Sequence, residues 1–495
     1  MKRNLLKNWP LVILVVLAFF TRFWNLSWPA EVVFDEVHFG KFVSAYFSHQ
    51  YYFDIHPPLG KLMIAGFAKL CGLRVDSDFN SIGTAFDPYS LFILRFLPAF
   101  FGAIFVLLIY QTILALGVSP KGAFFGAFLV LFDNAFLVES KFILIDLFLL
   151  CFGFTAFYSF ILCRKASGKK QIFLIVLSAI FSGLSFSIKW TGLTFLAVIL
   201  LSLFINFLKH FKIKLFFLKS LIFLIIPLLV YISFFAIHFR LLYKSGPGDA
   251  FMTPAFQKEL QGNKITEATK PLSFLEKFIE LNKRMYSASA TLTATHPDGS
   301  SWREWPIMRK PVWYWTKSSP SSKPEGVMNI YLIGNPLVWL MVILAIITSI
   351  SGLVINYPFN TKEINGVIPL FSLLVFGYFV NLLPFVFIGR VTFLYHYLPA
   401  LSFGVLISSI LVDRLVSPLK EAEEKPYRIK KLLEKGKLQL KQNFFDFRSL
   451  NYFALYSTLL TLVFLVFLFF APLSYGLPVK AGINHIYQSL IQFLH

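Results

Sequence analysis

The stretch LFILRFLPAFFGAIFVLLIYQTILAL, residues 91–116, decides the class of fold. It is long enough to cross a bilayer as a helix, which takes about 20 mostly apolar residues, and it carries a single charge, Arg95. Similar runs recur along most of the 495-residue chain, which is 57% hydrophobic and 14% charged. Because a water-soluble fold could not bury so much apolar surface, the sequence predicts an all-α polytopic membrane protein.

Eleven apolar runs are long enough to span a membrane. The first follows a basic start, as in a signal peptide, but it ends at Thr21-Arg22-Phe23-Trp24 rather than at a small-residue cleavage site, so we expect it to remain as a span. The predicted spans are 10–27, 91–116, 121–139, 142–163, 171–188, 190–208, 215–238, 334–356, 366–388, 393–412 and 452–474.

Basic residues explain the net charge of +21 and predict the orientation. They gather in alternate loops, after the fourth and sixth spans, before the first, and most of all between Arg414 and Arg448. The positive-inside rule then places the N-terminus in the cytoplasm and the C-terminus outside. The charge is therefore assigned to cytoplasmic loops on anionic lipid rather than to nucleic-acid binding.

The spacing of the spans divides the chain into three parts. Residues 1–240 form an N-terminal transmembrane module whose first external loop is 29–90. Residues 241–333 form a second external loop. Residues 334–495 form a C-terminal module of four helices, with a basic cytoplasmic loop at 413–450 that we expect to be helical and to bind anionic headgroups.

The first external loop contains an acidic pair, Asp35 and Glu36, followed by His38, Asp54 and His56. A partly desolvated carboxylate at the membrane edge can take a proton from an attacking hydroxyl, and two adjacent carboxylates push their pKa values apart. Two simpler interpretations stay open. The pair could be ordinary solvated loop charges, and the histidines could join Asp35 in a metal site, although no metal-motif spacing favours one.

Charges inside or beside the spans are costly and mark functional positions. Arg95, Asp146, Lys189 and Arg390 are such residues. The three cations suit a phosphate leaving group, whose charge they would stabilise in a medium of low dielectric. The alternatives are an internal salt bridge, for example Arg95 with Asp146, or snorkelling to headgroups.

Several aromatic and histidine residues allow two interpretations. His396 lies between two tyrosines on an apolar face and is either a structural histidine or a ligand contact. His296, followed by proline, belongs to the second loop. We expect the tryptophans of that loop to form an interfacial belt, with stacking on a sugar or peptide as the alternative; they are Trp302, Trp305, Trp313 and Trp315.

The loop sequence FDEVHFGKFVSAYF (34–47) and YYFDIHPPLGKLM (51–63) closely resembles the first lumenal loop of the protein O-mannosyltransferases. The resemblance continues in order along nearly the whole chain. The matching segments are LRFLPA (94–99), SKFILIDLFLL (140–150), SIKWTG (187–192), GDAFMTPAFQKELQGN (248–263), THPDGSSWREWPIMRKPVWYW (295–315) and GRVTFLYHYLPAL (389–401).

This resemblance implies a GT-C type glycosyltransferase fold with about eleven spans. It implies transfer of mannose from a polyprenyl-phosphate carrier to Ser or Thr hydroxyls of exported proteins, with inversion and with the lipid-linked mannose as the only co-substrate. Asp35 matches the family's loop acid, proposed as the base, Glu36 its partner, and Arg95 an arginine important for activity. The second loop is too short for the β-trefoil (MIR) domain of eukaryotic members, so the chain resembles the bacterial type, at the plasma membrane.

The predicted reaction is a single displacement in which Asp35 accepts the proton. Phosphate departs toward Arg95, Lys189 and Arg390, and no metal or other cofactor is required. We expect His38, Asp54 and His56 to contact the sugar or the lipid phosphate. Another lipid-linked-sugar transferase would share these features, and a transporter or flippase is the alternative of a different class, although the chain lacks the paired half-repeats typical of transporters.

Overall fold

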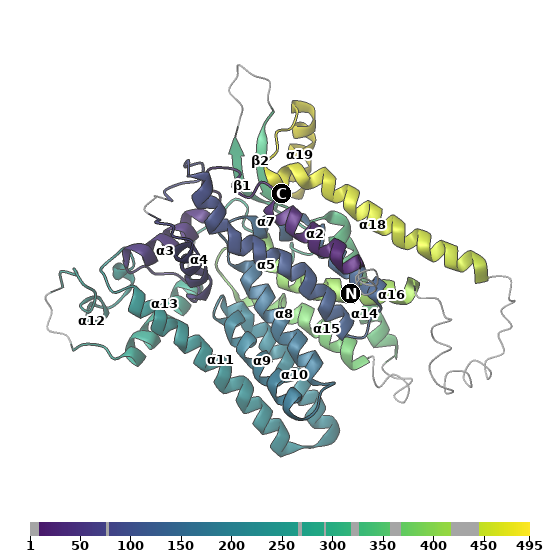
Figure 1. Ribbon diagram of the computed structural model, residues 1–495, viewed down its shortest axis with the longest axis horizontal. Helices are drawn as coiled ribbons and strands as arrows, with labels where there is room; N and C mark the ends of the chain where they lie inside the picture. The colour runs from purple at the N-terminus through teal and green to yellow at the C-terminus, as the bar shows by residue number, and fades with distance from the viewer. Residues whose placement is uncertain are drawn as a thin grey trace.

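The computed structural model describes residues 9–75, 79–265, 270–291, 294–317, 326–356, 368–416 and 445–495. Almost all of the regular structure is helical (Figure 1). The helices are α2 (Trp9–Phe23), α3 (Glu36–Ser48), α4 (Leu59–Leu70), α5 (Pro88–Ala115), α6 (Pro120–Leu131), α7 (Asn134–Lys141), α8 (Asp146–Cys163), α9 (Gly168–Phe186), α10 (Leu193–His210), α11 (Ile213–Leu241), α12 (Pro254–Gln257), α13 (Phe274–Thr291), α14 (Pro336–Asn356), α15 (Ile368–Val380), α16 (Leu398–Val416), α18 (Phe445–Tyr475) and α19 (Ala481–Leu494).

Short 3-10 helices and one hairpin complete the fold. Strands β1 (Val312–Lys317) and β2 (Met328–Leu332) pair antiparallel, with a register irregularity between Trp313 and Trp315. The 3-10 helices are η1 (Trp190–Gly192), η2 (Asp249–Phe251), η3 (Leu383–Phe387) and η4 (Leu394–Tyr397).

Each of the eleven predicted spans coincides with a helix or with two consecutive helices. In the part of the chain that the structure describes, seven helices are long and apolar enough to cross a membrane, and the bent pair α6–α7 brings the number to eight. The three remaining runs form shorter apolar helices, at Trp9–Phe23, Pro336–Gly352 and Phe371–Phe387. Apolar helices dominate because a bilayer leaves no other partner for backbone polar groups, and the polytopic all-α prediction is confirmed.

Helix α5 is central to the N-terminal half of the bundle. It packs against α2, α6, α7 and α8, while α9 packs between α8 and α11. Helices α14, α15 and α16 form a second group (Figure 1). Helix α16 joins this group to α6. Helices α3, α4, α12 and α13 and the β1–β2 hairpin lie around one end of the bundle (Figure 1).

The predicted span 121–139 differs from the structure because it is broken into two helices. Helices α6 and α7 meet at an angle of 59°. Asp133 causes the break: its Oδ1 accepts hydrogen bonds from the backbone N–H groups of Ala135 and Phe136, as an N-cap does. Its Oδ2 accepts from the backbone of Asn335 and from the Trp339 indole. A new helix therefore starts within the apolar run.

The basic loop predicted at 413–450 lies mostly outside the described residues. Helix α16 ends at Val416 and α18 begins at Phe445. The helical character and lipid contacts expected for this loop remain predictions.

Candidate active site

Asp35 sits in a tight turn immediately before α3. Its carboxylate is half-buried and makes no hydrogen bond or ion pair with any residue that the structure describes. Burial raises the pKa of Asp35 to about 6, and nearby His38 and Lys189 act in the opposite direction. A carboxyl group with free lone pairs and a pKa close to neutral is suited to accept a proton.

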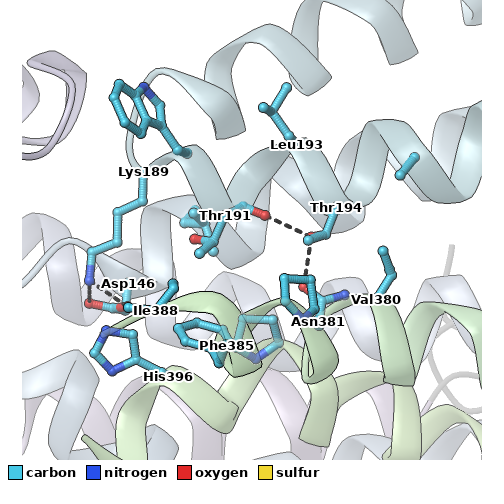
Figure 2. A pocket seen from close by; sticks show the side chains of 15 residues that line it. Asp146, Lys189, Thr191, Leu193, Thr194, Val380, Asn381, Phe385, Ile388 and His396 are labelled. Carbon is cyan, nitrogen blue, oxygen red and sulfur yellow. Dashed lines mark hydrogen bonds and ion pairs between the residues drawn. The ribbon is translucent and has the colours of Figure 1, made fainter. Parts of the chain in front are cut away.

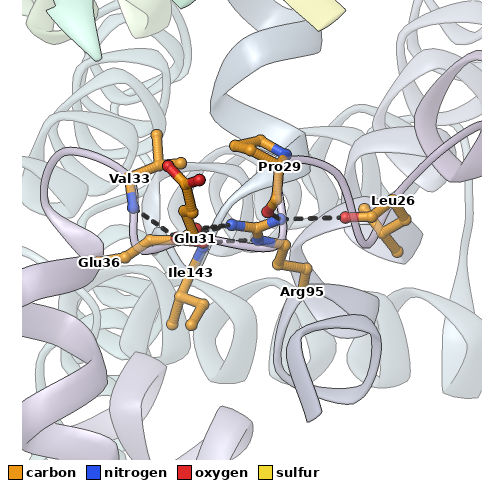
Figure 3. Close-up of polar contacts among 7 residues, drawn as sticks. All are labelled: Leu26, Pro29, Glu31, Val33, Glu36, Arg95 and Ile143. Carbon is orange, nitrogen blue, oxygen red and sulfur yellow. Dashed lines mark hydrogen bonds and ion pairs between the residues drawn. The ribbon is translucent and has the colours of Figure 1, made fainter. Parts of the chain in front are cut away.

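Glu36, by contrast, is fully buried and its carboxylate is saturated with donors (Figure 3). Its oxygens accept from Nε and Nη2 of Arg95, both at 2.8 Å. They also accept from the backbone N–H of Val33 at 2.9 Å and of Ile143 at 3.0 Å. Glu36 therefore has no lone pair facing an empty site, and it fixes the turn that carries Asp35.

Arg95 is also fully buried, and each of its five N–H donors is used. Besides the two bonds to Glu36, it donates to the carbonyl oxygens of Leu26, Pro29 and Glu31 at 3.0–3.3 Å (Figure 3). The internal salt bridge of Arg95 is thus made with Glu36, and the pairing with Asp146 considered from the sequence is wrong. Arg95 holds the start of the first loop against α5.

Lys189 and Asp146 form a second buried pair, close enough to Asp35 for both charges to affect its pKa. The Lys189 ammonium donates to both carboxylate oxygens of Asp146, at 2.9 and 2.7 Å (Figure 2). It also lies 5.3 Å from the centre of the Tyr395 ring. Sequence reasoning singled out both residues, but it paired neither with the other.

A cavity of about 370 Å³ opens beside this pair. Its walls come from the start of α10 and from the end of α15 with η3, and most of them are apolar (Figure 2). The residues that line it are Asp146, Leu149, Lys189, Trp190, Thr191, Leu193, Thr194, Ala197, Val380, Asn381, Pro384, Phe385, Ile388, His396 and Pro399.

A second cavity of about 270 Å³ shares Lys189 and His396 with the first. It adds His56, Arg390 and Tyr286 from three separate segments. Burial lowers the pKa of His56 well below its usual value, and Lys189, Arg390 and Lys61 act in the same direction. Arg390 is half-buried and makes no ion pair with the described residues. This cavity is therefore cationic and suited to an anion.

Asp54 and His38 line neither of these two cavities. Asp54 is paired with Lys61, which also donates to the His56 carbonyl at 2.8 Å. His38 is exposed on α3. Among the described residues, no three His, Cys, Asp or Glu side chains gather as metal ligands, so the structure does not bring Asp35, His38 and His56 together as a metal site.

The predicted tryptophan belt is wrong for two of its four members. Trp305 is completely buried, stacks on His396 with ring centres 5.8 Å apart, and donates to Ser300. Trp315 is buried as well, and its indole donates to Glu31. His396 accepts from the Phe393 backbone through Nδ1, so it is held structurally and still lines both cavities. His296 is exposed and its ring contacts Phe393.

Sequence reasoning missed Glu139 and Tyr314. Glu139 is 1% exposed, and its Oε1 accepts a hydrogen bond from the Tyr314 hydroxyl, with 2.6 Å between the two oxygens. The signal was available, since Glu139 is an ionisable residue at the end of an apolar run. The proximity of Tyr314, 175 residues away, was not readable from the sequence.

Comparison with known proteins gives consistent matches. A family model described as dolichyl-phosphate-mannose-protein mannosyltransferase matches residues 12–243. A second, described as the C-terminal four TMM region of protein-O-mannosyltransferase, matches residues 274–490. Together they cover most of the chain.

Individual relatives match over about half of the chain. Dolichyl-phosphate-mannose–protein mannosyltransferase 1 of Candida albicans is 38% identical over 271 residues, which are 52% of this chain and 31% of that protein. Dolichyl-phosphate-mannose–protein mannosyltransferase 6 of Saccharomyces cerevisiae is 33% identical over 313 residues, 59% of this chain and 40% of that protein. The matched region thus spans well under half the length of these relatives.

Solved structures share the fold. The S. cerevisiae protein O-mannosyltransferase Pmt1–Pmt2 complex bound to the sugar donor is similar with a TM-score of 0.82 at 21% identity, covering 99% of this chain and 92% of that chain. The Archaeoglobus fulgidus oligosaccharyltransferase follows with a TM-score of 0.56 at 14% identity, covering 98% and 58%. These likenesses confirm the GT-C type of fold. With both family models matched in order along one such fold, this chain belongs to the protein O-mannosyltransferase family.

Proposed function

We propose that this protein transfers mannose from a polyprenyl-phosphate mannose to Ser or Thr hydroxyls of exported proteins, with inversion at the anomeric carbon. The observation that carries the proposal is a free, half-buried carboxylate, Asp35, close enough to Lys189 for the charge of Lys189 to lower its pKa, while Lys189 lines both a mostly apolar cavity and a cationic one. Family membership supports the sugar and the class of acceptor.

The two cavities suit the two parts of a lipid-linked donor. The apolar cavity between α10 and α15 suits isoprenoid units, because its walls are mostly hydrocarbon. The cationic cavity, with Lys189, Arg390 and neutral His56, suits the phosphate. Lys189 lines both cavities and is also close enough to Asp35 to affect its pKa. The sugar is thereby proposed to lie between the phosphate and Asp35.

The proposed reaction is one displacement. Asp35 takes the proton of the acceptor hydroxyl as its oxygen bonds to the anomeric carbon. The bond from that carbon to the phosphate oxygen breaks, and the electron pair leaves with the phosphate, where Lys189 and Arg390 stabilise it. Glu36 and Arg95 act on this step only by holding Asp35, because both are saturated with partners.

We further propose a bacterial plasma membrane location, with the N-terminus cytoplasmic and the C-terminus outside. The distribution of Lys and Arg supports this orientation. It puts Asp35 and the β1–β2 hairpin on the outer face, where acceptor proteins emerge from the secretion channel.

No divalent metal is required in the proposed reaction, because cationic side chains take the role of charge stabilisation. Transfer measured with a chelator and after addition of Mg²⁺, Mn²⁺ or Ca²⁺ tests this point. Activity that is lost with chelator and restored by one of these ions would overturn it.

The test of the function itself uses membranes containing the full chain, radiolabelled polyprenyl-phosphate mannose and a Ser/Thr peptide. Wild type should label the peptide, and Asp35→Asn should not, because an amide cannot accept the proton. Lys41→Gln, an exposed change on the same helix α3, serves as the control and should transfer normally. Equal transfer by Asp35→Asn and wild type would remove Asp35 as the base.

A further inference from the structure

The backbone immediately before Asp35 is strained. Phe34 has a φ of +39°, in the left-handed region that a bulky residue rarely adopts. Such a conformation persists only where the surroundings hold it, and it is often found at functional sites. The residues that pack against Phe34 must therefore hold it in this conformation.

Tyr314 of β1 is the main support of Phe34. The two rings stack with centres 4.3 Å apart and planes 16° from parallel. The Phe34 backbone N–H donates to the Tyr314 carbonyl oxygen at 3.1 Å. Tyr314 thus contacts both the backbone and the ring of Phe34. Phe393 and Tyr395 make edge-to-face contacts with the same ring.

Tyr314 is in turn anchored inside the bundle. Its hydroxyl donates to Glu139 Oε1 at 2.6 Å, and both side chains are buried. The second oxygen of Glu139 has no hydrogen-bond partner among the residues that the structure describes. The hydrogen bond to Glu139 fixes Tyr314 to α7, because on separation the buried carboxyl and the buried hydroxyl would each lose a hydrogen bond that nothing replaces.

We propose that Tyr314 is a positioning residue for the reaction: anchored to Glu139, it holds Phe34 in the left-handed conformation and so fixes the direction of the Asp35 carboxylate. The β1–β2 hairpin of the second loop thereby sets the direction of the Asp35 carboxylate in the first loop. This inference rests on the proposed function for its kinetic consequence, but the packing that it describes can be tested without turnover.

The electrostatic surroundings of Asp35 allow such a test. Burial is the main cause that raises its pKa to about 6. Releasing Phe34 would let water reach the carboxyl group and lower this pKa toward its ordinary value. The titratable and charged groups that face Asp35 from the elements around it are His38, Asp54, Glu139, Asp146, Lys189, Tyr314 and Tyr395.

The variants separate the hydroxyl from the ring. Tyr314→Phe removes the bond to Glu139 and keeps the stack, whereas Tyr314→Leu removes both. Glu139→Gln keeps an oxygen that accepts the hydroxyl, so it should behave like wild type, and Glu139→Leu should behave like Tyr314→Phe. Tyr331→Phe is the matched control, since it removes a tyrosine hydroxyl from the neighbouring strand β2. There the Tyr331 hydroxyl is hydrogen-bonded to the Gln488 side chain.

The first measurement is chemical. A hydrophobic carbodiimide reacts with protonated carboxyl groups, and peptide mass spectrometry then gives the pH midpoint of Asp35 modification in the full-length protein. We expect a midpoint near 6 in wild type, lower by up to about one unit in Tyr314→Leu, by less in Tyr314→Phe, and unchanged in Tyr331→Phe.

The second measurement is kinetic. Misdirecting Asp35 should lower kcat by about tenfold in Tyr314→Phe and further in Tyr314→Leu, with the donor KM within about twofold, because a small misplacement penalises the chemical step. An unchanged midpoint and kcat in Tyr314→Leu would overturn the proposal. So would a lower kcat with an unchanged midpoint, which indicates a merely structural role. A shifted midpoint in a protein whose wild type transfers no mannose would support the positioning and refute the proposed function.

Discussion

Replacing Arg95 with methionine separates two roles for this residue, binding of the lipid phosphate and fixation of the first loop. In the structure all five N–H groups of Arg95 are used within the protein, two of them on Glu36. The methionine variant leaves the Glu36 carboxylate with only the backbone N–H groups of Val33 and Ile143. A buried charge would then lack its counter-ion.

The expected cost follows from this geometry. Removing one partner of a buried ion pair costs about 3–5 kcal/mol, and three carbonyl oxygens lose their donor at the same time, so the upper end applies. Glu36→Gln should cost about 3 kcal/mol, because the Arg95 charge stays buried without its carboxylate. The double variant should cost less than the sum of the two, with a coupling of about 2 kcal/mol.

The assay is the apparent melting temperature of the purified full chain in detergent, taken at one heating rate because unfolding of such proteins is usually irreversible. Lys317→Met is the control: it breaks the exposed ion pair with Glu31, which contributes about 0–1 kcal/mol. The donor KM is measured on the same preparations. A melting temperature equal to wild type, together with a donor KM raised more than about tenfold, would refute the structural role and assign Arg95 to the phosphate.

Three further predictions concern the proposed reaction. Because Asp35 must be ionised to accept a proton and burial raises its pKa to about 6, initial rates should fall as the pH drops through about 6, and a flat profile from about pH 5 to 8 would contradict this. Arg390→Gln should raise the donor KM about tenfold without changing thermal stability, since Arg390 makes no ion pair with the described residues; an unchanged KM would exclude phosphate contact. Ala197→Trp should fill the apolar cavity and raise the KM of a long-chain donor more than that of a short-chain analogue, and equal effects on the two donors would argue against an isoprenoid site there.

The helices could be predicted because the physical constraint is local. Within a bilayer every backbone group must be paired inside its own segment, so the length of an apolar run such as 91–116 nearly determines a helix. The break at Asp133 could not be predicted, because it is not set by local sequence alone. Its effect depends on partners in the C-terminal half, Asn335 and Trp339, about 200 residues away.

The candidate site could be predicted only in part. Charged residues in or beside apolar runs stand out, so Lys189, Asp146 and Arg390 were found from the sequence. Which charge pairs with which depends on tertiary packing: Arg95 pairs with Glu36 rather than with Asp146, and Asp146 pairs with Lys189. The amphipathic pattern that favoured a tryptophan belt is equally compatible with burial, as in Trp305.

The broken span connects these observations. The bend leaves carbonyl oxygens at the end of α6 without partners in their own helix, and the turn between α7 and α8 does the same for the Ile143 N–H. A membrane does not tolerate unpaired backbone groups. Arg22 of the first helix supplies donors to the carbonyl oxygens of Val130 and Leu131. Glu36 supplies the acceptor for the Ile143 N–H.

The end of α6 and the segment after α7 are therefore completed by charged side chains from the first 36 residues. The first loop is thus hydrogen-bonded to the bundle through the same carboxylate, Glu36, that fixes the turn at Asp35. Helix α7, which lies between the end of α6 and this segment, carries Glu139 toward Tyr314. If the helix continued without interruption from α7 into α8, the Ile143 N–H would donate within its own helix, and Glu36 would lose one of the four donors that fix its carboxylate. The interruptions on either side of α7 thus allow the first loop, the β1–β2 hairpin and helices α5 and α7 together to hold the Asp35 carboxylate.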